Sequence, residues 1–142
     1  MFRIITLSFL LTVFAGALYA HGNVVPSAVD VEGLPPLDDW GTENPYRDTE
    51  GEVREKIIET GQRGYGQNCV NCHGLEAVSG GIAPDLRMLE PGFDDQYFIS
   101  MVREGGKGMP SFEAMMEPES VWAIKTWLET KYEDAMAEKY GN

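Results

Sequence analysis

The sequence predicts an all-α domain of three to four helices. Apolar side chains recur every three to four positions in three segments of the chain, and no segment shows the alternation of a β-strand. Glycine and proline residues gather between these segments, where they favour loops. The length of 142 residues suits one domain with a short leader and is too small for two ordinary domains.

The first 20 residues, MFRIITLSFLLTVFAGALYA, have the pattern of a secretory signal peptide. One positive charge at Arg3 precedes an apolar run, and small residues follow it. We expect cleavage after Ala20, with a second small-residue site after Ala17, and hence a periplasmic protein with no membrane anchor after cleavage. An uncleaved anchor is the alternative, because a helix of this length just crosses a bilayer core of ~30 Å.

The charge balance is strongly acidic. Removal of the leader takes away Arg3 and no acidic residue, so that the net charge of −12 becomes −13. Such a field disfavours nucleic acid and anionic lipid surfaces, and it favours a fast, salt-sensitive encounter with a basic patch on a partner. Acidity also keeps a protein soluble, and taken alone it indicates no more than that.

Residues 21–50 are expected to form an extended, irregular arm. They contain four prolines and show neither a helical nor an alternating period. Apolar side chains are spread along the segment at Val31, Leu34, Leu37, Trp40 and Tyr46. We place the following domain at residues 51–142. The apolar side chains favour an arm that lies on the surface of this domain, and a flexible linker is the alternative.

The first helix is predicted from Glu52 to about Gln67, directly before a cysteine motif. Its inward face is predicted to comprise Val53, Ile57, Ile58, Gly61 and Tyr65. Residues 74–92 hold four glycines and two prolines and are therefore predicted to form a loop.

Two further helices are predicted. One spans Asp94 to Glu104 and ends at a run of glycines that begins with Gly105; its inward side chains are predicted to be Tyr97, Phe98, Met101 and Val102. The other begins near Pro118, a residue that suits the first turn of a helix, and continues to about Lys139. Its stripe is predicted to comprise Val121, Trp122, Ile124, Lys125, Leu128 and Tyr132.

The only two cysteines of the chain, Cys69 and Cys72, lie in one CVNCH pentapeptide. In an exported protein this pattern is a haem attachment signature. Two cysteines three positions apart near a helix end point the same way, so that both thiols can add to the vinyl groups of one haem. His73 then lies under the iron as its proximal ligand.

Two other sites remain possible for these residues. A structural zinc site needs about four protein ligands, and besides the cysteines only His73 and His21, with carboxylates, are available. A thioredoxin-like redox pair normally follows a strand in a βαβ pattern, which this sequence does not show. A disulfide across so short a loop would contribute little to stability.

The sixth ligand of the iron is predicted to be Met109, in the segment GGKGMPSF. Glycines let the backbone pass close to a flat ring, and Pro110 fixes the turn beyond the sulfur. Met115 and Met116 are the main competitors, and His21 is a further one. Ligation by His73 and Met109 leaves no open position for oxygen, peroxide or substrate, and a thioether raises the reduction potential relative to two histidines. The pair favours electron transfer without bond chemistry.

From Glu52 to about Tyr132 the chain resembles a class I cytochrome c. The order of motifs matches that family: CVNCHG at 69–74, APDL at 83–86, GMPSF at 108–112, and a closing helix with two tryptophans. The resemblance implies the class I fold around one covalently bound haem c. It also implies that the Pro84 carbonyl accepts a hydrogen bond from His73, that Leu86 packs on the haem, and that the first and last helices cross at Gly61, where an aromatic side chain approaches.

The segments HGNVVP, LPPL, TENPYR and GLEAVSGGIAPDLR more narrowly resemble the soluble periplasmic cytochromes c that accept electrons from pyrroloquinoline quinone (PQQ) dependent alcohol dehydrogenases, including ethanol and methanol types. This resemblance implies a one-electron carrier and not an enzyme, with the dehydrogenase as donor and a terminal oxidase or another cytochrome of the respiratory chain as acceptor. The alternatives are a small peroxidase-like haem enzyme with a labile sixth ligand, a haem-based sensor, and a carrier for a different dehydrogenase or oxidase.

Overall fold

The structure is a computed structural model that describes residues 25–141. The expected signal peptide, its cleavage site at Ala20 and His21 lie outside the described residues. Within residues 25–141 there are helices and loops and no β-strand, which confirms the predicted all-α class.

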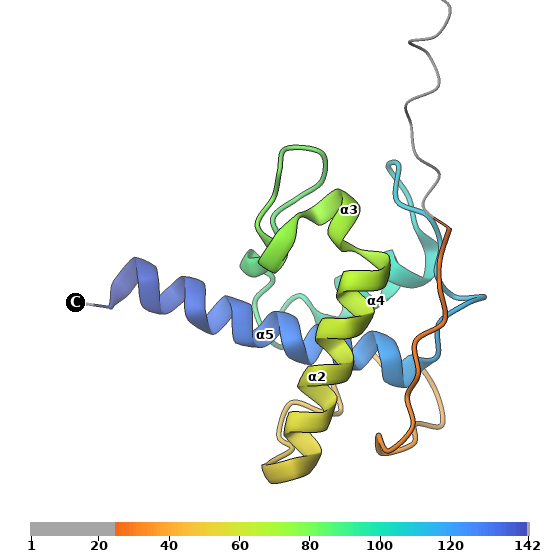
Figure 1. Ribbon diagram of the computed structural model, residues 1–142. Coiled ribbons are helices and arrows are strands. Elements are labelled where there is room, and N and C mark those ends of the chain that lie inside the picture. The colour runs from red at the N-terminus through yellow and green to blue at the C-terminus, as the bar shows by residue number, and fades with distance from the viewer. Residues whose placement is uncertain (1–24, 142) are drawn as a thin grey trace, which may run out of the picture.

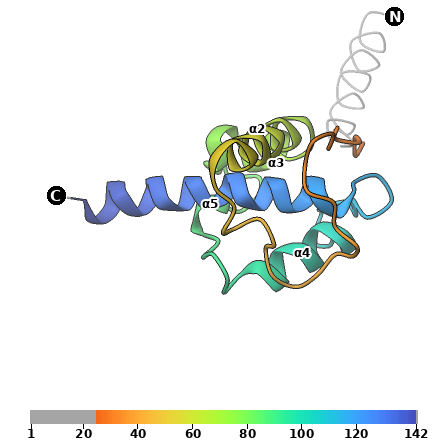
Figure 2. The same cartoon turned by 90° about the horizontal axis from the view of Figure 1, so that it is seen from below.

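Helix α5 (Pro118–Tyr140) is the element around which the others pack. Every residue from 121 to 129 is buried, so this part of the helix is covered on all sides. Helices α2 (Gly51–Asn68) and α4 (Asp95–Glu104) lie on opposite sides of α5 (Figures 1 and 2). The last turns extend beyond this core and carry exposed charged residues.

Helix α2 buries a face that repeats every three to four residues. Its fully buried members include Ile57, Gly61 and Tyr65, which were predicted to point inward. The prediction for Val53 is wrong, because this side chain is 45% exposed. Val53 lies in the first turn of α2, whereas the buried face begins only at Ile57.

Helices α2 and α5 cross at Gly61, where their backbones come very close. A Cβ atom built on Gly61 would lie 2.0 Å from the carbonyl oxygen of Ala123. The crossing point is therefore the expected one, but the partner is backbone and not the aromatic side chain that the resemblance implied. An aromatic contact occurs one turn further along, where the ring centroids of Tyr65 and Trp127 are 4.6 Å apart.

Helix α4 contacts α5 and buries Phe98, Ile99 and Val102, and the ring centroids of Phe98 and Trp122 are 6.5 Å apart. The prediction that Tyr97 points inward is wrong, since this side chain is 58% exposed. Successive helical residues are rotated by about 100°. The buried face is centred on the ridge from Asp95 to Val102, which leaves Tyr97 on the solvent side.

Residues 25–50 of the arm form no helix or strand, yet they are tied to the helices. Tyr46 is buried, and Leu34, Leu37 and Trp40 pack against the core. The indole Nε1 of Trp122 donates to the carbonyl oxygen of Trp40 at 2.6 Å. These contacts contradict a flexible linker over this segment.

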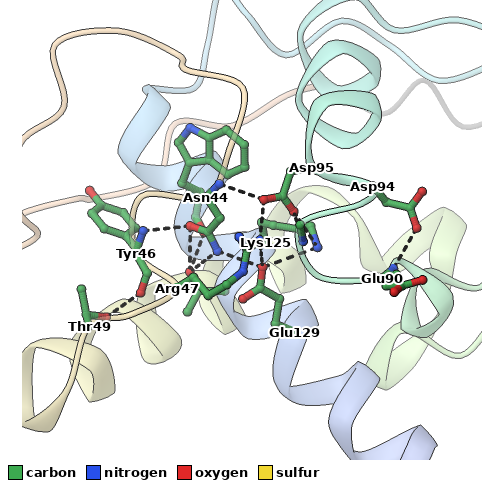
Figure 3. Close-up of polar contacts among 12 residues, drawn as sticks. Asn44, Tyr46, Arg47, Thr49, Glu90, Asp94, Asp95, Lys125 and Glu129 are labelled. Carbon is green, nitrogen blue, oxygen red and sulfur yellow. Dashed lines mark hydrogen bonds and ion pairs between the residues drawn. The ribbon is translucent and has the colours of Figure 1, made fainter.

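A buried ionic cluster joins the arm, α4 and α5 (Figure 3). Lys125 Nζ lies 3.3 Å from Asp95 Oδ1 and 3.6 Å from Glu129 Oε1. Arg47 of the arm contacts both carboxylates, at 2.8 Å in the case of Glu129. Burial alone would raise the pKa of Asp95, but hydrogen bonds from Arg47 and from the Asn44 amide hold this pKa below its ordinary value.

Candidate haem site

The CVNCH motif forms a single helical turn at the end of α2. Helix α2 ends at Asn68, and the short helix α3 (Val70–His73) follows after Cys69. The amide of His73 donates to the carbonyl oxygen of Cys69 at 3.0 Å. Cys69 and Cys72 are therefore one turn apart in one rigid segment, and both are half-buried free thiols.

The His73 side chain is buried and has a defined partner. Its Nδ1 atom lies 2.9 Å from the carbonyl oxygen of Pro84, in the loop that follows. A carbonyl oxygen only accepts hydrogen bonds, so Nδ1 carries the proton in this contact. The Nε2 atom of the neutral ring is then the unprotonated nitrogen, which is the form that binds a metal.

The turn after His73 depends on Gly74. Its φ of +81° lies in the region that favours glycine, and a Cβ atom there would come within 2.0 Å of the carbonyl oxygen of Val78. The Tyr65 hydroxyl donates to the Gly74 carbonyl oxygen at 2.7 Å. Sequence reasoning assigned Tyr65 only to the inward face of its helix and missed this hydrogen bond, because a hydroxyl partner leaves no signal in helical periodicity.

Leu86 opens the short 3₁₀ helix η3 (Leu86–Met88), two residues after Pro84. Its side chain is half-buried and packs against the core. The carboxylate of Asp85 caps η3 by accepting from the Arg87 amide at 3.0 Å, and it also pairs with the Arg87 guanidinium. The residues directly after Pro84 are therefore anchored, and they hold the segment that supplies its carbonyl.

Met109 lies in a closed turn of the loop that follows α4. Its amide donates to the Gly106 carbonyl oxygen at 2.9 Å, and the Gly106 amide donates back to the Met109 carbonyl oxygen at 2.9 Å. The side chain is half-buried against the core. Of the competitors, Met115 is 47% exposed and Met116 is fully packed in the core.

The surroundings of Cys69 disfavour the thiolate form of its side chain. Burial, together with the neighbouring Cys72, raises the pKa of the Cys69 thiol to about 12. Disulfide exchange requires a thiolate, which this environment disfavours. Among residues 25–141 there is also no group of three or more His, Cys, Asp or Glu side chains that would hold a metal ion, so a zinc site finds no support there.

Comparison with known proteins decides the family. The family model described as cytochrome c oxidase, cbb3-type, subunit III matches residues 56–128, just over half of the chain. Cytochrome c550 of Pseudomonas aeruginosa is 44% identical over 122 residues, which cover 81% of this chain and 83% of that protein.

The chain belongs to the cytochrome c family.

This cytochrome is also similar to parts of larger enzymes. Quinohemoprotein alcohol dehydrogenase ADH IIB of Pseudomonas putida is 39% identical over 84 residues, 56% of this chain and 12% of that protein. The dehydrogenase subunit of the quinone alcohol dehydrogenase of Gluconobacter oxydans is 32% identical over 114 residues, 76% of this chain and 14% of that protein. The cytochrome thus corresponds to a small part of each dehydrogenase. No solved structure gives a significant match.

The cofactor of this family is haem c, and the residues of this chain fit it. Two thiols one helical turn apart match the two thioether bonds, and a buried imidazole with a free Nε2 matches the proximal ligand. The single CVNCH motif gives one haem, so the protein is a mono-haem cytochrome c of an electron-carrier family. None of the described helices has the length and apolar character needed to cross a membrane.

Proposed function

We propose that this cytochrome is a periplasmic one-electron carrier that accepts electrons from a PQQ-dependent alcohol dehydrogenase and passes them to a terminal oxidase or another cytochrome of the respiratory chain. The observation that carries the proposal is the buried His73 imidazole, whose Nδ1 lies 2.9 Å from the Pro84 carbonyl oxygen, and we propose the Met109 thioether as the second axial ligand. The bond to Pro84 leaves Nε2 of His73 available, and the Met109 side chain is half-buried against the core. Haem c supplies an iron that changes between two oxidation states.

The axial pair also argues against an enzyme. With His73 and Met109 as ligands, both faces of the iron would be covered, and no position would be left for peroxide or oxygen. Cys69 and Cys72 would hold the haem covalently, while Leu86 would pack on it. A small domain gains from such covalent attachment, because its core alone buries a large cofactor poorly.

Similarity to cytochrome segments of quinone-linked alcohol dehydrogenases supports the choice of donor. The surface charge supports it further. All seven acidic residues between positions 25 and 50 are exposed, and none of them takes part in an ion pair within the described part of the chain. A partner with a basic patch would be attracted at long range, and salt would weaken the attraction.

Mixing experiments test the donor. The oxidised holo-cytochrome is mixed with a PQQ alcohol dehydrogenase and its alcohol, and haem reduction is followed at increasing salt. We expect rapid reduction that slows as salt is raised, whereas reduction by an uncharged hydroquinone, the control, stays constant. Slow reduction by the dehydrogenase at every salt concentration would exclude this donor.

Ligand binding tests the carrier against the enzyme. Carbon monoxide added to the reduced native protein should bind slowly or not at all, because Met109 covers the iron. Rapid binding would support the peroxidase-like alternative. Met109→Ala should abolish the long-wavelength iron–sulfur absorption of the oxidised form, and Met115→Ala should leave it unchanged. The reverse pattern would reassign the ligand.

Fractionation tests the location. We expect the mature chain in the periplasmic fraction with an N-terminus at His21, which follows the predicted cleavage after Ala20. A full-length chain in the membrane fraction would instead indicate an uncleaved anchor.

A further inference from the structure

The loop that carries Met109, residues 105–113, folds back directly over the end of α4. The Phe112 amide donates to the Val102 carbonyl oxygen at 3.0 Å, and the Ser111 hydroxyl donates to the Arg103 carbonyl oxygen. A Cβ atom on Gly105 would lie 2.7 Å from the Met109 carbonyl oxygen. We call residues 105–113 the Met109 loop.

The first half of the Met109 loop is rich in glycine, which gives its backbone conformational freedom. Gly105, Gly106 and Gly108 all have positive φ, and Lys107 between them has a φ of +50°. Glycines make such a turn possible but restrict it weakly, since they gain the most conformational entropy when the turn opens. The position of the Met109 side chain therefore depends on contacts from outside the turn.

Arg103, in the last turn of α4, makes such contacts on two sides. Its Nε donates to Glu113 Oε1 at 3.0 Å, and its Nη2 donates to the same oxygen. Its guanidinium carbon lies 5.2 Å from the ring centroid of Trp40. One side chain therefore joins the end of the Met109 loop to the arm.

Trp40 is itself a fixed support. It packs against the core, and its carbonyl oxygen accepts the hydrogen bond from Trp122 of α5. The arm runs past the segment between α4 and α5 in both views (Figures 1 and 2). The guanidinium thus lies between a held indole ring and a carboxylate of the Met109 loop.

We propose that Arg103 is a positioning residue that couples the arm to the Met109 loop, and that its contacts with Trp40 and Glu113 limit how often the loop opens and its thioether leaves the iron. The proposal rests on the proposed role of Met109 as the sixth ligand. It gives the arm a function in the stability of the iron–sulfur bond, beyond covering the core.

The rate at which cyanide binds the oxidised holo-protein measures this opening, because cyanide needs the position that Met109 covers. Arg103→Leu removes both contacts and should speed cyanide binding about fivefold, which corresponds to about 1 kcal/mol. This size is that of an exposed ion pair together with a cation–π contact. Arg103→Lys keeps the charge but not the planar two-sided contact, and it should give a smaller increase.

Glu113→Gln breaks the pair on the loop side, and Glu117→Gln is its matched control. Glu117 is exposed, lies four residues further on, and takes part in no ion pair among the described residues. Glu113→Gln should speed cyanide binding, and Glu117→Gln should leave it unchanged. Equal effects of the two variants would show that the loss of any negative charge in this region speeds cyanide binding, and this would overturn the proposal.

A double-mutant cycle tests the link to the arm. Trp40→Leu should speed cyanide binding in the parent protein and have a clearly smaller effect when Arg103 is already Leu. Purely additive effects would remove the arm from the mechanism. Thermal unfolding of each variant separates this role from a structural one, since a mere loss of stability would lower the unfolding temperature without raising the cyanide rate.

The outcomes separate this proposal from the ligand assignment. If Met109→Ala retains the iron–sulfur absorption, the ligand assignment and this proposal are both wrong. If Met109→Ala abolishes that absorption while Arg103→Leu binds cyanide at the parent rate, the proposed function stands and the positioning role of Arg103 is wrong.

Discussion

The carbonyl oxygen of Ala123 in α5 occupies the space that a side chain at Gly61 in α2 would need. A Cβ atom at position 61 would lie only 2.0 Å from that oxygen, and both groups are helix backbone that cannot rotate away. The two helices therefore approach at a distance that only glycine allows, and this crossing supports the helix that leads into the haem motif.

Gly61→Ala should destabilise the protein by about 3 kcal/mol or more, because the helices must separate to admit the methyl group. Urea unfolding followed by circular dichroism measures the change. Gly66→Ala is the matched control in the same helix, since nothing lies within 4 Å of its Cβ position, and it should stabilise by up to about 1 kcal/mol. A Gly61→Ala protein as stable as the parent would contradict the crossing.

Asp95→Asn should cost about 3 kcal/mol. The change keeps the shape of the side chain but leaves Lys125 and Arg47 in a buried site with Glu129 as the one remaining anion of the cluster. Asp134→Asn removes a carboxylate that is 71% exposed and should cost less than about 1 kcal/mol. Similar unfolding free energies for the two variants would contradict a buried cluster.

Acid should weaken the fold through the same carboxylate. The pKa of Asp95 is lower in the folded protein than its ordinary value of ~3.9, so the unfolded chain binds more protons between these two values. Its contribution is complete above about pH 4 and is lost as the pH falls through the folded-state pKa. The unfolding free energy should thus fall below about pH 4, and less steeply in Asp95→Asn; equal slopes would contradict the assignment.

Tyr65→Phe should destabilise by about 1 kcal/mol, because it removes the hydroxyl that donates to the Gly74 carbonyl oxygen and leaves the ring contact with Trp127 in place. Tyr97→Phe is the control, since that exposed hydroxyl makes no hydrogen bond within the described residues. Urea unfolding compares the two. A larger loss in Tyr97→Phe would show that the turn after His73 does not depend on Tyr65.

Helical periodicity predicted most of the fold. The starts and ends of α2, α4 and α5 lie within one residue of the predicted ones, because glycines, prolines and the cysteine motif mark them clearly. Periodicity shows which face of a helix is buried, but it does not show at which residue the contact with a neighbouring element begins. The inward placement of Val53, in the first turn of α2, was therefore wrong. Periodicity also does not fix the edge of a buried face, which is why Tyr97 was misplaced.

The polar interior was not predictable in the same way. Lys125 was placed in the inward stripe of the last helix, but its partners Arg47, Asp95 and Glu129 come from segments far apart in the sequence. Ion pairing depends on the tertiary arrangement and leaves no local pattern. The haem motif was predictable, because its two cysteines and its histidine lie within five consecutive residues, CVNCH.

The mass and the colour of the purified, exported protein test the central claim most directly. The account predicts a coloured protein whose mass exceeds that of the polypeptide by one haem, with a reduced-minus-oxidised spectrum of a c-type haem that is lost when Cys69 and Cys72 are both replaced by alanine. A colourless protein with the mass of the bare polypeptide would contradict it.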